Sequence, residues 1–344
     1  MFRLRNPESE DNYIIVYMYG GSFILKHTIV DIPWLVIDGK PTGFYSCISG
    51  DIVFEHTKIK NVAIRWTTVF LCSANLVFRN SIVAGKIGTI GSFELFENIE
   101  AYGGSVIIEN SILADGIGII GHGVNVSVSN SFLRGLVLKF DDGSFAKIKN
   151  STIAFGNIFF ETCEANDTII MRNSLIYNNT NVRINPTKCG GERPDAVDVR
   201  YNWWGDASGP YIEEFNPEGK GQKIDEIHLD VTKIYPWLTE PPKKIPEFEV
   251  KIEPPVAIVG YPINISIIVP EDVRIVFGYF KPDYDVVFAG DYTGISYVYE
   301  RSGQRKLEAF VVTDNFVAIG IVKTMYIVSV KEVDTMAVSY THLT

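Results

Sequence analysis

The segment VSVSNSFL (residues 126–133) recurs through the N-terminal part of this chain with the same Asn-Ser pair at its centre. It returns as AKIKNSTI (146–153) and IIMRNSLI (169–176), and VIIENSIL (106–113) and LVFRNSIV (76–83) precede it. The shared asparagines recur at intervals of about 20 to 30 residues, and they are Asn80, Asn110, Asn130, Asn150 and Asn173. Intervals of this length are typical of a solenoid in which each repeat is one coil.

Looser copies extend the pattern towards the N-terminus. ILKHTIV (24–30) and VFEHTKI (53–59) have a histidine, His27 or His56, in place of the asparagine, and LFENIEA (95–101) resembles the others around Asn98. The residue two positions before the anchor is apolar in every copy, which predicts a strand with one buried face. A hydroxyl follows most anchors and suits a tight bend, where it can bond the local backbone.

A repeat of this size is too small to bury its own apolar face. Coils stacked about 4.8 Å apart bury a continuous core, because each strand pairs with its equivalent in the next coil. The asparagines would then form an inward ladder of hydrogen-bonded amides, since a buried amide without partners is costly. We therefore predict a right-handed parallel β-helix over residues 1–240, with Asn202 as the last member of the ladder.

A distinctive module follows the last repeat. It reads NWWGDASGP (202–210), NPEGKG (216–221) and YPWL (235–238). Together with the repeats, this module resembles the pectin-lyase-like β-helix superfamily, especially periplasmic and surface proteins of bacteria and archaea, over roughly residues 12–240. The resemblance implies the fold and not one activity, because the architecture carries lyases, hydrolases, adhesins and stalks. We interpret the module as a lid that covers exposed strand edges.

The pattern changes after the linker PPKKIP (241–246). Short alternating strands with regular turn signals predict an immunoglobulin-like β-sandwich over residues 246–334. The final VSYTHLT (338–344) resembles the translated end of a transposon-based sequencing adapter. The chain already reads as strand by about Tyr13, and no signal peptide is visible, so we expect both ends to be truncated.

The chain is acidic, with 41 Asp and Glu against 31 Lys and Arg and a net charge of -10. This balance and the lack of a visible basic patch argue against nucleic acid as a partner. No apolar run reaches the ~20 residues that span a bilayer. The residue before each anchor should face outward, where opposite charges in successive copies would support each other modestly (Lys26, Glu55, Arg79, Glu97, Glu109, Ser129, Lys149, Arg172).

The cysteines are spaced by about one coil, which brings backbones within disulfide range. We predict a disulfide between Cys163 and Cys189, whereas Cys47 and Cys72 are equally compatible with stacked buried thiols. An even number of cysteines with paired spacings favours an oxidising, extracellular or cell-surface setting.

Some short motifs resemble fragments of polygalacturonase motifs, namely GHG (121–123), DDG (141–143) and RIN (183–185). Their order is reversed relative to that family, and Asn185 stands where the family has lysine. Inverting hydrolysis needs carboxylates about 6.5–9.5 Å apart, whereas neighbouring Asp141 and Asp142 would diverge in a turn. We interpret DDG as a solvated turn, and we expect no metal site because His122 lacks partners at ligand spacing.

A lyase is the second reading of the same region. It would use acids on successive coils with Arg183 as the base and calcium as cofactor, the acids being Glu161, Asp167, Asp195 and Asp198. Loop acids are more often simply solvated, so we favour a non-catalytic structural or adhesive protein without a cofactor. Its expected partners are polysaccharides or cell-envelope components, with Trp203, Trp204 and Tyr211 as candidate rings for stacking on sugars.

Overall fold

The computed structural model describes residues 13–18, 22–30, 34–39, 46–48, 50–59, 62–65, 69–72, 74–85, 87–90, 95–96, 98–164, 166–184, 196–283 and 286–329. Within these ranges the regular elements are all strands. The chain divides into two compact units, Met1–Lys244 and Ile245–Thr344, which are described separately. A search of the described residues for a helix long and apolar enough to cross a membrane finds none.

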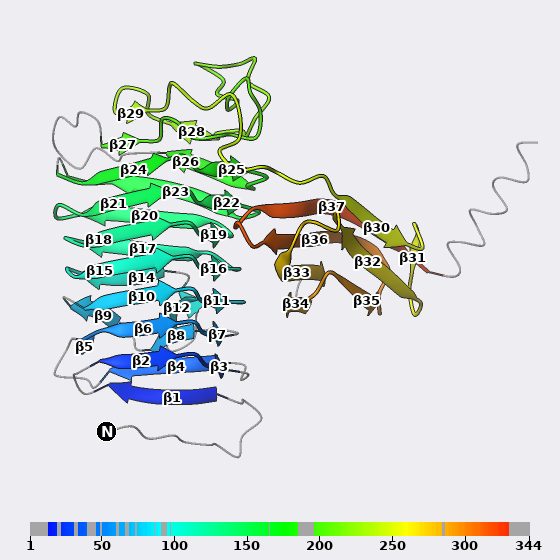
Figure 1. The fold of residues 1–344 in the computed structure, drawn as a ribbon, viewed down its shortest axis with the longest axis horizontal. Coiled ribbons are helices and arrows are strands. Elements are labelled where there is room, and N and C mark those ends of the chain that lie inside the picture. The colour runs from blue at the N-terminus through cyan, green and yellow to red at the C-terminus, as the bar shows by residue number, and fades with distance from the viewer. Residues whose placement is uncertain are drawn as a thin grey trace, which may run out of the picture. The chain divides into compact units, whose positions relative to one another are not determined.

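The first unit consists of the stacked parallel sheets of a β-helix (Figure 1). Sheet 1 contains β2 (Phe23–Lys26), β6 (Ile52–Glu55), β10 (Asn75–Arg79), β15 (Ser105–Glu109), β18 (Asn125–Ser129), β21 (Phe145–Lys149), β24 (Thr168–Arg172), β27 (Val197–Asp198) and β29 (Thr232–Lys233). Sheet 2 contains β5 (Ser46–Ile48), β9 (Val69–Cys72), β14 (Asn98–Tyr102), β17 (Ile117–His122), β20 (Leu136–Asp141), β23 (Asn157–Thr162), β26 (Asn181–Ile184) and β28 (Glu226–Ile227).

Two further sheets complete the coils. Sheet 3 contains the short strands β3 (Ile29–Val30), β7 (Lys58–Ile59), β11 (Ile82–Val83), β16 (Ile112–Leu113), β19 (Phe132–Leu133), β22 (Thr152–Ala154) and β25 (Leu175–Tyr177). The first coils add a sheet of β1 (Tyr13–Met18), β4 (Trp34–Gly39), β8 (Val62–Arg65), β12 (Ile87–Ile90) and β13 (Leu95–Phe96), in which β12 and β13 pair antiparallel. Residues 80–110 form one long coil, because β10 pairs directly with β15.

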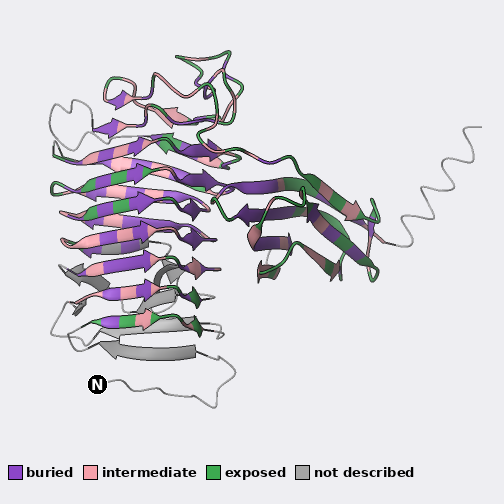
Figure 2. Ribbon diagram, viewed as in Figure 1, coloured by how far each residue is buried: buried purple, intermediate pink, exposed green. Residues whose placement is uncertain are grey.

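The register of sheet 1 keeps the apolar position two before each anchor inside the core. Phe78 pairs with Phe54 on one side and with Ile108 on the other. All three side chains are fully buried, and the Phe54 and Phe78 rings stack with centroids 5.1 Å apart. Buried and more exposed positions alternate along these strands (Figure 2). The strands and core that the repeats predict are therefore confirmed.

The ladder inside the β-helix is made by the hydroxyl residues that follow the anchors. The Ser81 backbone N–H donates to Ser111 Oγ at 3.1 Å, and the Ser111 N–H donates to Ser131 Oγ at 3.1 Å. Each hydroxyl also donates to the carbonyl two residues earlier, as Ser81 does to Arg79 at 2.7 Å. The buried hydroxyl ladder comprises Thr57, Ser81, Ser111, Ser131, Ser151 and Ser174.

The prediction that the anchor asparagines point inward and form a ladder is wrong. Asn80, Asn110, Asn130, Asn150 and Asn173 have φ values of 45° to 51°, and none of them is buried. Asparagine and histidine are enriched in this left-handed region, which explains why His27 and His56 take the same place. Their rings stack with centroids 4.8 Å apart. The anchor is thus a bend residue, and the hydroxyl after it holds the coils together.

Asn202 lies one position away from its predicted register. Leu175, two residues after the Asn173 anchor, pairs with Trp203, which places Tyr201 opposite Asn173. Tyr201 also has the left-handed φ of an anchor, at 56°. Asn202 instead occupies the hydroxyl position, where its Oδ1 accepts the Ser174 N–H at 3.0 Å. Its side chain is fully buried. Asn202 therefore ends the hydroxyl ladder, and the amide replaces the serine of the earlier coils.

The module after Asn202 packs onto the last coil. Trp204 belongs to the main hydrophobic core and is 1% exposed, while Trp203 pairs with Leu175 and extends sheet 3. Gly209 lies against the Trp237 ring, since an added Cβ would come within 2.2 Å of it. These contacts match the predicted lid.

The second unit contains two sheets. One contains β30 (Glu249–Glu253), β32 (Pro262–Ile268) and β35 (Gly294–Val298). The other contains β31 (Ala257–Ile258), β33 (Ile275–Asp283), β34 (Val286–Gly290), β36 (Gly303–Thr313) and β37 (Ala318–Val328). Both contribute buried apolar side chains, including Ile265 and Phe310, and β32 contacts β36. The immunoglobulin-like topology stays a prediction, and residues 338–344 lie outside the described part.

Candidate functional site

The outward face of sheet 1 has two distinct charge patterns. Over the first coils, opposite charges stack in pairs: Lys26 Nζ lies 2.6 Å from Glu55 Oε2, and Arg79 Nε lies 3.3 Å from Glu109 Oε2. These pairs confirm the predicted stacking of opposite charges for the first coils. It does not hold for Lys149, which lies opposite Arg172, and Glu97 lies outside the described residues. Because water reaches both partners of each pair, the pairs stabilise the fold only slightly.

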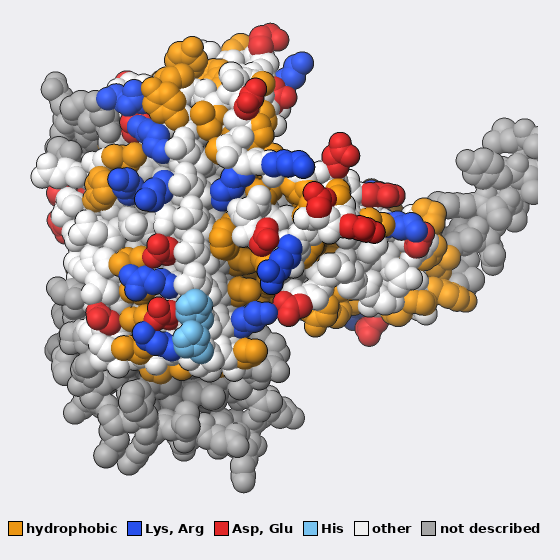
Figure 3. All heavy atoms as spheres, in the orientation of Figure 1, with side chains coloured by type: hydrophobic (Ala, Val, Ile, Leu, Met, Phe, Trp, Pro, Cys, Tyr) orange, Lys and Arg blue, Asp and Glu red, His pale blue; other side chains and the backbone are white. Residues whose placement is uncertain are grey.

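Over the last coils the same face is basic. Asp198 is the single carboxylate among the described outward-facing residues of these coils, which belong to β21, β24, β27, β29 and the residues directly after each strand. Figure 3 shows Lys and Arg side chains gathered over these upper coils, whereas acidic and basic side chains alternate over the lower ones. We call this surface the basic band, and it comprises Lys147, Lys149, Arg172, Arg200 and Lys233.

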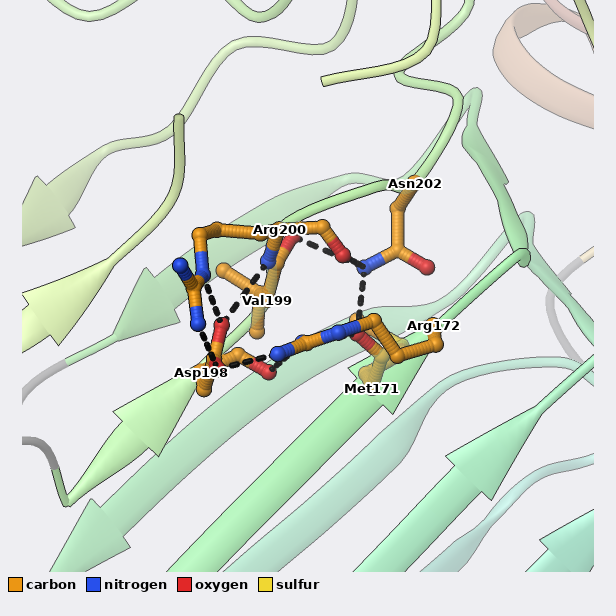
Figure 4. Close-up of polar contacts among 6 residues, drawn as sticks. All are labelled: Met171, Arg172, Asp198, Val199, Arg200 and Asn202. Atoms are coloured by element: carbon orange, nitrogen blue, oxygen red, sulfur yellow. Dashed lines mark hydrogen bonds and ion pairs between the residues drawn. The ribbon is translucent and has the colours of Figure 1, made fainter. Parts of the chain in front are cut away.

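Asp198 holds two arginines of the basic band in place (Figure 4). Arg200 donates from Nε to Oδ1 at 2.9 Å and from Nη2 to Oδ2 at 2.8 Å. Arg172 donates from Nη2 to Asp198 Oδ2 and from Nη1 to the Asp198 carbonyl at 2.7 Å. Burial raises the pKa of Asp198, but the hydrogen bonds from Arg200 and Arg172 outweigh it and lower the pKa to about 2. The carboxylate thus fixes both guanidinium groups while cancelling one of their charges.

The low pKa of Asp198 makes a pH-dependent contribution to stability. Its folded value of about 2 lies below the unfolded value of about 3.9, so the contribution is present above about pH 4 and is lost as the pH falls towards 2. Urea unfolding of the wild type and Asp198→Asn should differ by about 2 to 3 kcal/mol more at pH 5 than at pH 2. A difference that does not change with pH would contradict the assigned pKa.

Exposed aromatic rings lie at the edge of the basic band. Tyr201 is 44% exposed, and the Arg172 and Arg200 guanidinium carbons lie 5.7 and 5.9 Å from its ring centroid. The Tyr201 N–H donates to Pro236 O at 2.7 Å, which brings the neighbouring Tyr235 close. Tyr235 is 62% exposed and packs edge-on against Trp237, with ring centroids 5.0 Å apart. The Tyr201 ring therefore lies beside two fixed cations, and the lid adds a second exposed ring, Tyr235, close in the backbone.

The aromatic residues proposed from the sequence for sugar stacking are placed differently. Trp204 is 1% exposed and Trp203 is 9% exposed, so neither ring offers a face to a ligand. The correction has a simple reason for Trp204, whose ring belongs to the main hydrophobic core at the end of the β-helix. Tyr211 is half-buried and pairs with Lys223 inside the lid module. Tyr201 and Tyr235 are among the rings that the fold exposes, and neither was proposed from the sequence.

The acids of the lyase reading do not converge in the described structure. Asp167 is fully buried, and its carboxylate accepts N–H groups from Gly143, Ser144, Cys163 and Glu164 at 2.8 to 3.1 Å. Glu161 and Arg183 lie on sheet 2, where their ion-pair partners are Lys139 and Glu226, each 3.9 Å away. Asp198 lies on sheet 1, and Asp195 is outside the described residues.

A histidine and two aspartates come together at the end of sheet 2. The register pairs His122 with Asp141, and His122 Nδ1 lies 3.8 Å from Asp142 Oδ2 as well as contacting the Asp141 carboxylate. The prediction that His122 lacks partners at ligand spacing is therefore wrong. Asp142 and Gly143 do form an exposed turn, as predicted for DDG. His122 and Asp141 occupy equivalent positions in neighbouring coils, so the pairing of β17 with β20 brings them side by side. Their separation of about one repeat in the sequence is the signal from which this contact could have been predicted.

The cysteines are only partly described. Cys163 takes part in a disulfide bond, and Cys189, its predicted partner, lies outside the described residues. In sheet 2 the register places Cys47 opposite Phe70 and not opposite Cys72. The Cys163–Cys189 pairing stays a prediction.

The comparisons with known proteins give little guidance. No family model and no curated protein matches this chain. One solved structure that matches is described as "Structural basis for the promiscuous specificity of the carbohydrate-binding modules from the beta-sandwich super family". It is 16% identical, with a TM-score of 0.23, and the match covers 25% of this chain and 36% of that one. A TM-score this low does not establish a shared fold.

Proposed function

We propose that this chain is part of an extracellular or cell-surface structural β-helix protein that binds an acidic polysaccharide through the basic band. One observation carries the proposal. In a chain with a net charge of -10, the described residues on the outward face of the last coils of sheet 1 are Lys147, Lys149, Arg172, Arg200 and Lys233 against Asp198 as the single carboxylate. Such a local reversal of charge favours an anionic ligand and directs it to this face.

The arrangement of the basic band suits a polymer with regularly repeated acidic groups. Neighbouring coils are about 4.8 Å apart, so the cations form a column that runs along the axis of the β-helix. Guanidinium groups such as those of Arg172 and Arg200 match carboxylate and sulfate oxygens in geometry. The exposed faces of Tyr201 and Tyr235 can pack against the apolar faces of sugar rings at the end of the column.

The contacts of the candidate acids support a binding role over a catalytic one. A general acid or base needs a pKa near the working pH, whereas Asp198, with a pKa of about 2, stays ionised. The buried Asp167 carboxylate is occupied by backbone N–H groups. Neither residue is available for proton transfer.

The test combines binding and turnover. Uronic-acid polymers, sulfated glycans, neutral glycans and single-stranded DNA are presented to the full chain, with and without calcium, by affinity electrophoresis. Reducing ends and unsaturated products are measured in parallel. We expect retardation by acidic glycans, none by neutral glycans, and no products. Products that disappear in Arg183→Ala would establish the lyase instead. Equal retardation by DNA would show a non-specific polyanion surface and would contradict the proposal.

A further inference from the structure

The cluster formed by His122, Asp141 and Asp142 has the chemistry of a metal site. His122 is the last residue of β17, Asp141 is the last residue of β20, and Asp142 begins the turn that follows. One ligand atom of each residue lies within 4.8 Å of the other two. His122 Nδ1 and Asp142 Oδ2 are 3.8 Å apart, a separation that two ligand atoms of a single ion bound at about 2.0–2.2 Å can have.

The local sequence explains how the histidine is presented. An added Cβ at Gly121 would come within 2.2 Å of Val124 Cγ1, so this position packs tightly inward and directs its neighbour His122 outward. Gly123 has a φ of 67°, which ends the strand in the left-handed region. The Tyr102 ring stacks on the imidazole with centroids 4.1 Å apart and an angle of 9° between the planes. The imidazole is therefore held in one orientation.

The aspartates are also positioned by the fold. Asp142 has a φ of 54°, a conformation that aspartate tolerates better than most residues, and Gly143 continues the turn with a φ of 78°. The backbone N–H of Gly143 donates to the buried Asp167, which ties the turn to the next coil. Both carboxylates are consequently placed beside His122 by stacked backbone and not by flexible side chains alone.

The electrostatics of the cluster favour a cation. The carboxylates of Asp141 and Asp142 both face the same nitrogen of His122, so two like charges repel each other across the cluster. The carboxylates of Asp141 and Asp142 share a small volume, so a divalent ion between them would relieve this repulsion. The Asp142 side chain is 66% exposed, which leaves the cluster open to an ion from solvent.

We propose that His122, Asp141 and Asp142 bind a divalent transition-metal ion such as Zn²⁺, Co²⁺ or Mn²⁺. The imidazole nitrogen decides the class of metal, because Ca²⁺ and Mg²⁺ prefer ligand sets made only of oxygen. These protein ligands leave coordination positions for water. The site lies on sheet 2, whereas the basic band lies on sheet 1, and the proposal does not depend on acidic-polysaccharide binding.

The test uses the full chain with any affinity tag removed and all metal stripped by chelation. Zn²⁺ and Co²⁺ are titrated by calorimetry, and the visible absorption of Co²⁺ reports on the ligand set. We expect one equivalent of metal to bind and the melting temperature to rise with metal concentration. His122→Gln and Asp142→Asn should each weaken binding at least tenfold while leaving the metal-free melting temperature and circular dichroism close to those of the wild type.

His56→Asn provides a matched control, because it removes another surface imidazole and inserts the residue that the repeat has at that position. This variant should bind Zn²⁺ as the wild type does. Absence of binding in the wild type would overturn the proposal. Binding that His122→Gln leaves unchanged, or that His56→Asn abolishes, would overturn it too.

Discussion

Replacing Asp167 by asparagine should lower the free energy of unfolding of the β-helix by about 3 to 5 kcal/mol. The Asp167 carboxylate is fully buried and accepts N–H groups from two successive turns, Gly143 and Ser144 through Oδ1 and Cys163 and Glu164 through Oδ2. Asparagine keeps one acceptor oxygen but turns its NH₂ group towards two N–H donors. Hydrogen bonds to a charged group contribute about 1.5–3 kcal/mol each, so losing one side of this site is costly.

The measurement is urea unfolding followed by far-UV circular dichroism at pH 7. Glu164→Gln is the matched control, because it makes the same chemical change on an exposed side chain in the same turn. It should change stability by no more than about 0.5 kcal/mol. A cost below about 1 kcal/mol for Asp167→Asn would show that the turns do not depend on this carboxylate.

Replacing Asn202 by alanine should destabilise the β-helix by a similar amount, about 3 to 5 kcal/mol. Asn202 Oδ1 accepts the Ser174 N–H, and Nδ2 donates to Met171 O at 2.9 Å and to Val199 O at 2.8 Å. These backbone groups lie at the last coil, and alanine leaves them buried without the amide. Each unsatisfied buried group costs about 1–3 kcal/mol.

Asn202→Ser separates the acceptor role of the Asn202 side chain from its donor role. Serine is the residue that the earlier coils have in this register, so its hydroxyl can again accept the Ser174 N–H, but it cannot replace both Nδ2 bonds. Thermal and urea unfolding should rank the wild type above Asn202→Ser and Asn202→Ser above Asn202→Ala. Equal losses in the two variants would show that the ladder acceptor contributes nothing at the last coil.

The core of the β-helix could be predicted from the sequence because it depends on alternation. Phe54, Phe78 and Ile108 stack as the repeats indicate. In each copy every second residue is buried, and the copies are one coil apart. These two regularities together determine where the strands lie.

The role of the anchor residues could not be read from alternation, because a left-handed bend interrupts it. The repeat position held by Asn80 is held by His56 in another copy, and this alternation indicated the role of the position. Both residue types tolerate positive φ, whereas a buried amide ladder would not readily accept histidine. In the last coil the bend residue is Tyr201, one position before the asparagine that was assigned to it from the repeats. Asn202 therefore lies at the hydroxyl position, and Tyr201 takes the exposed bend beside the basic band.

The candidate sites depend on pairings between coils that the sequence does not reveal residue by residue. Lys149, Arg172 and Arg200 are far apart in the chain, and no segment of the sequence looks basic. Stacking places them on one face, and the same effect brings His122 to Asp141. Coil lengths vary between repeats, so the residues that meet become known only when the register is known.

The most direct test of the proposed function measures how tightly the full chain binds an acidic polysaccharide when lysines of the basic band are replaced. Calorimetry with a uronic-acid polymer compares the wild type with Lys147→Gln/Lys149→Gln, at increasing NaCl concentration. The control, Lys251→Gln/Lys323→Gln, removes the same charge from exposed positions of the second unit. We predict at least tenfold weaker binding and a smaller salt dependence for the first variant only, because fewer cations meet the polymer. Binding that both variants retain, or no binding by the wild type, would contradict a polysaccharide site on the basic band.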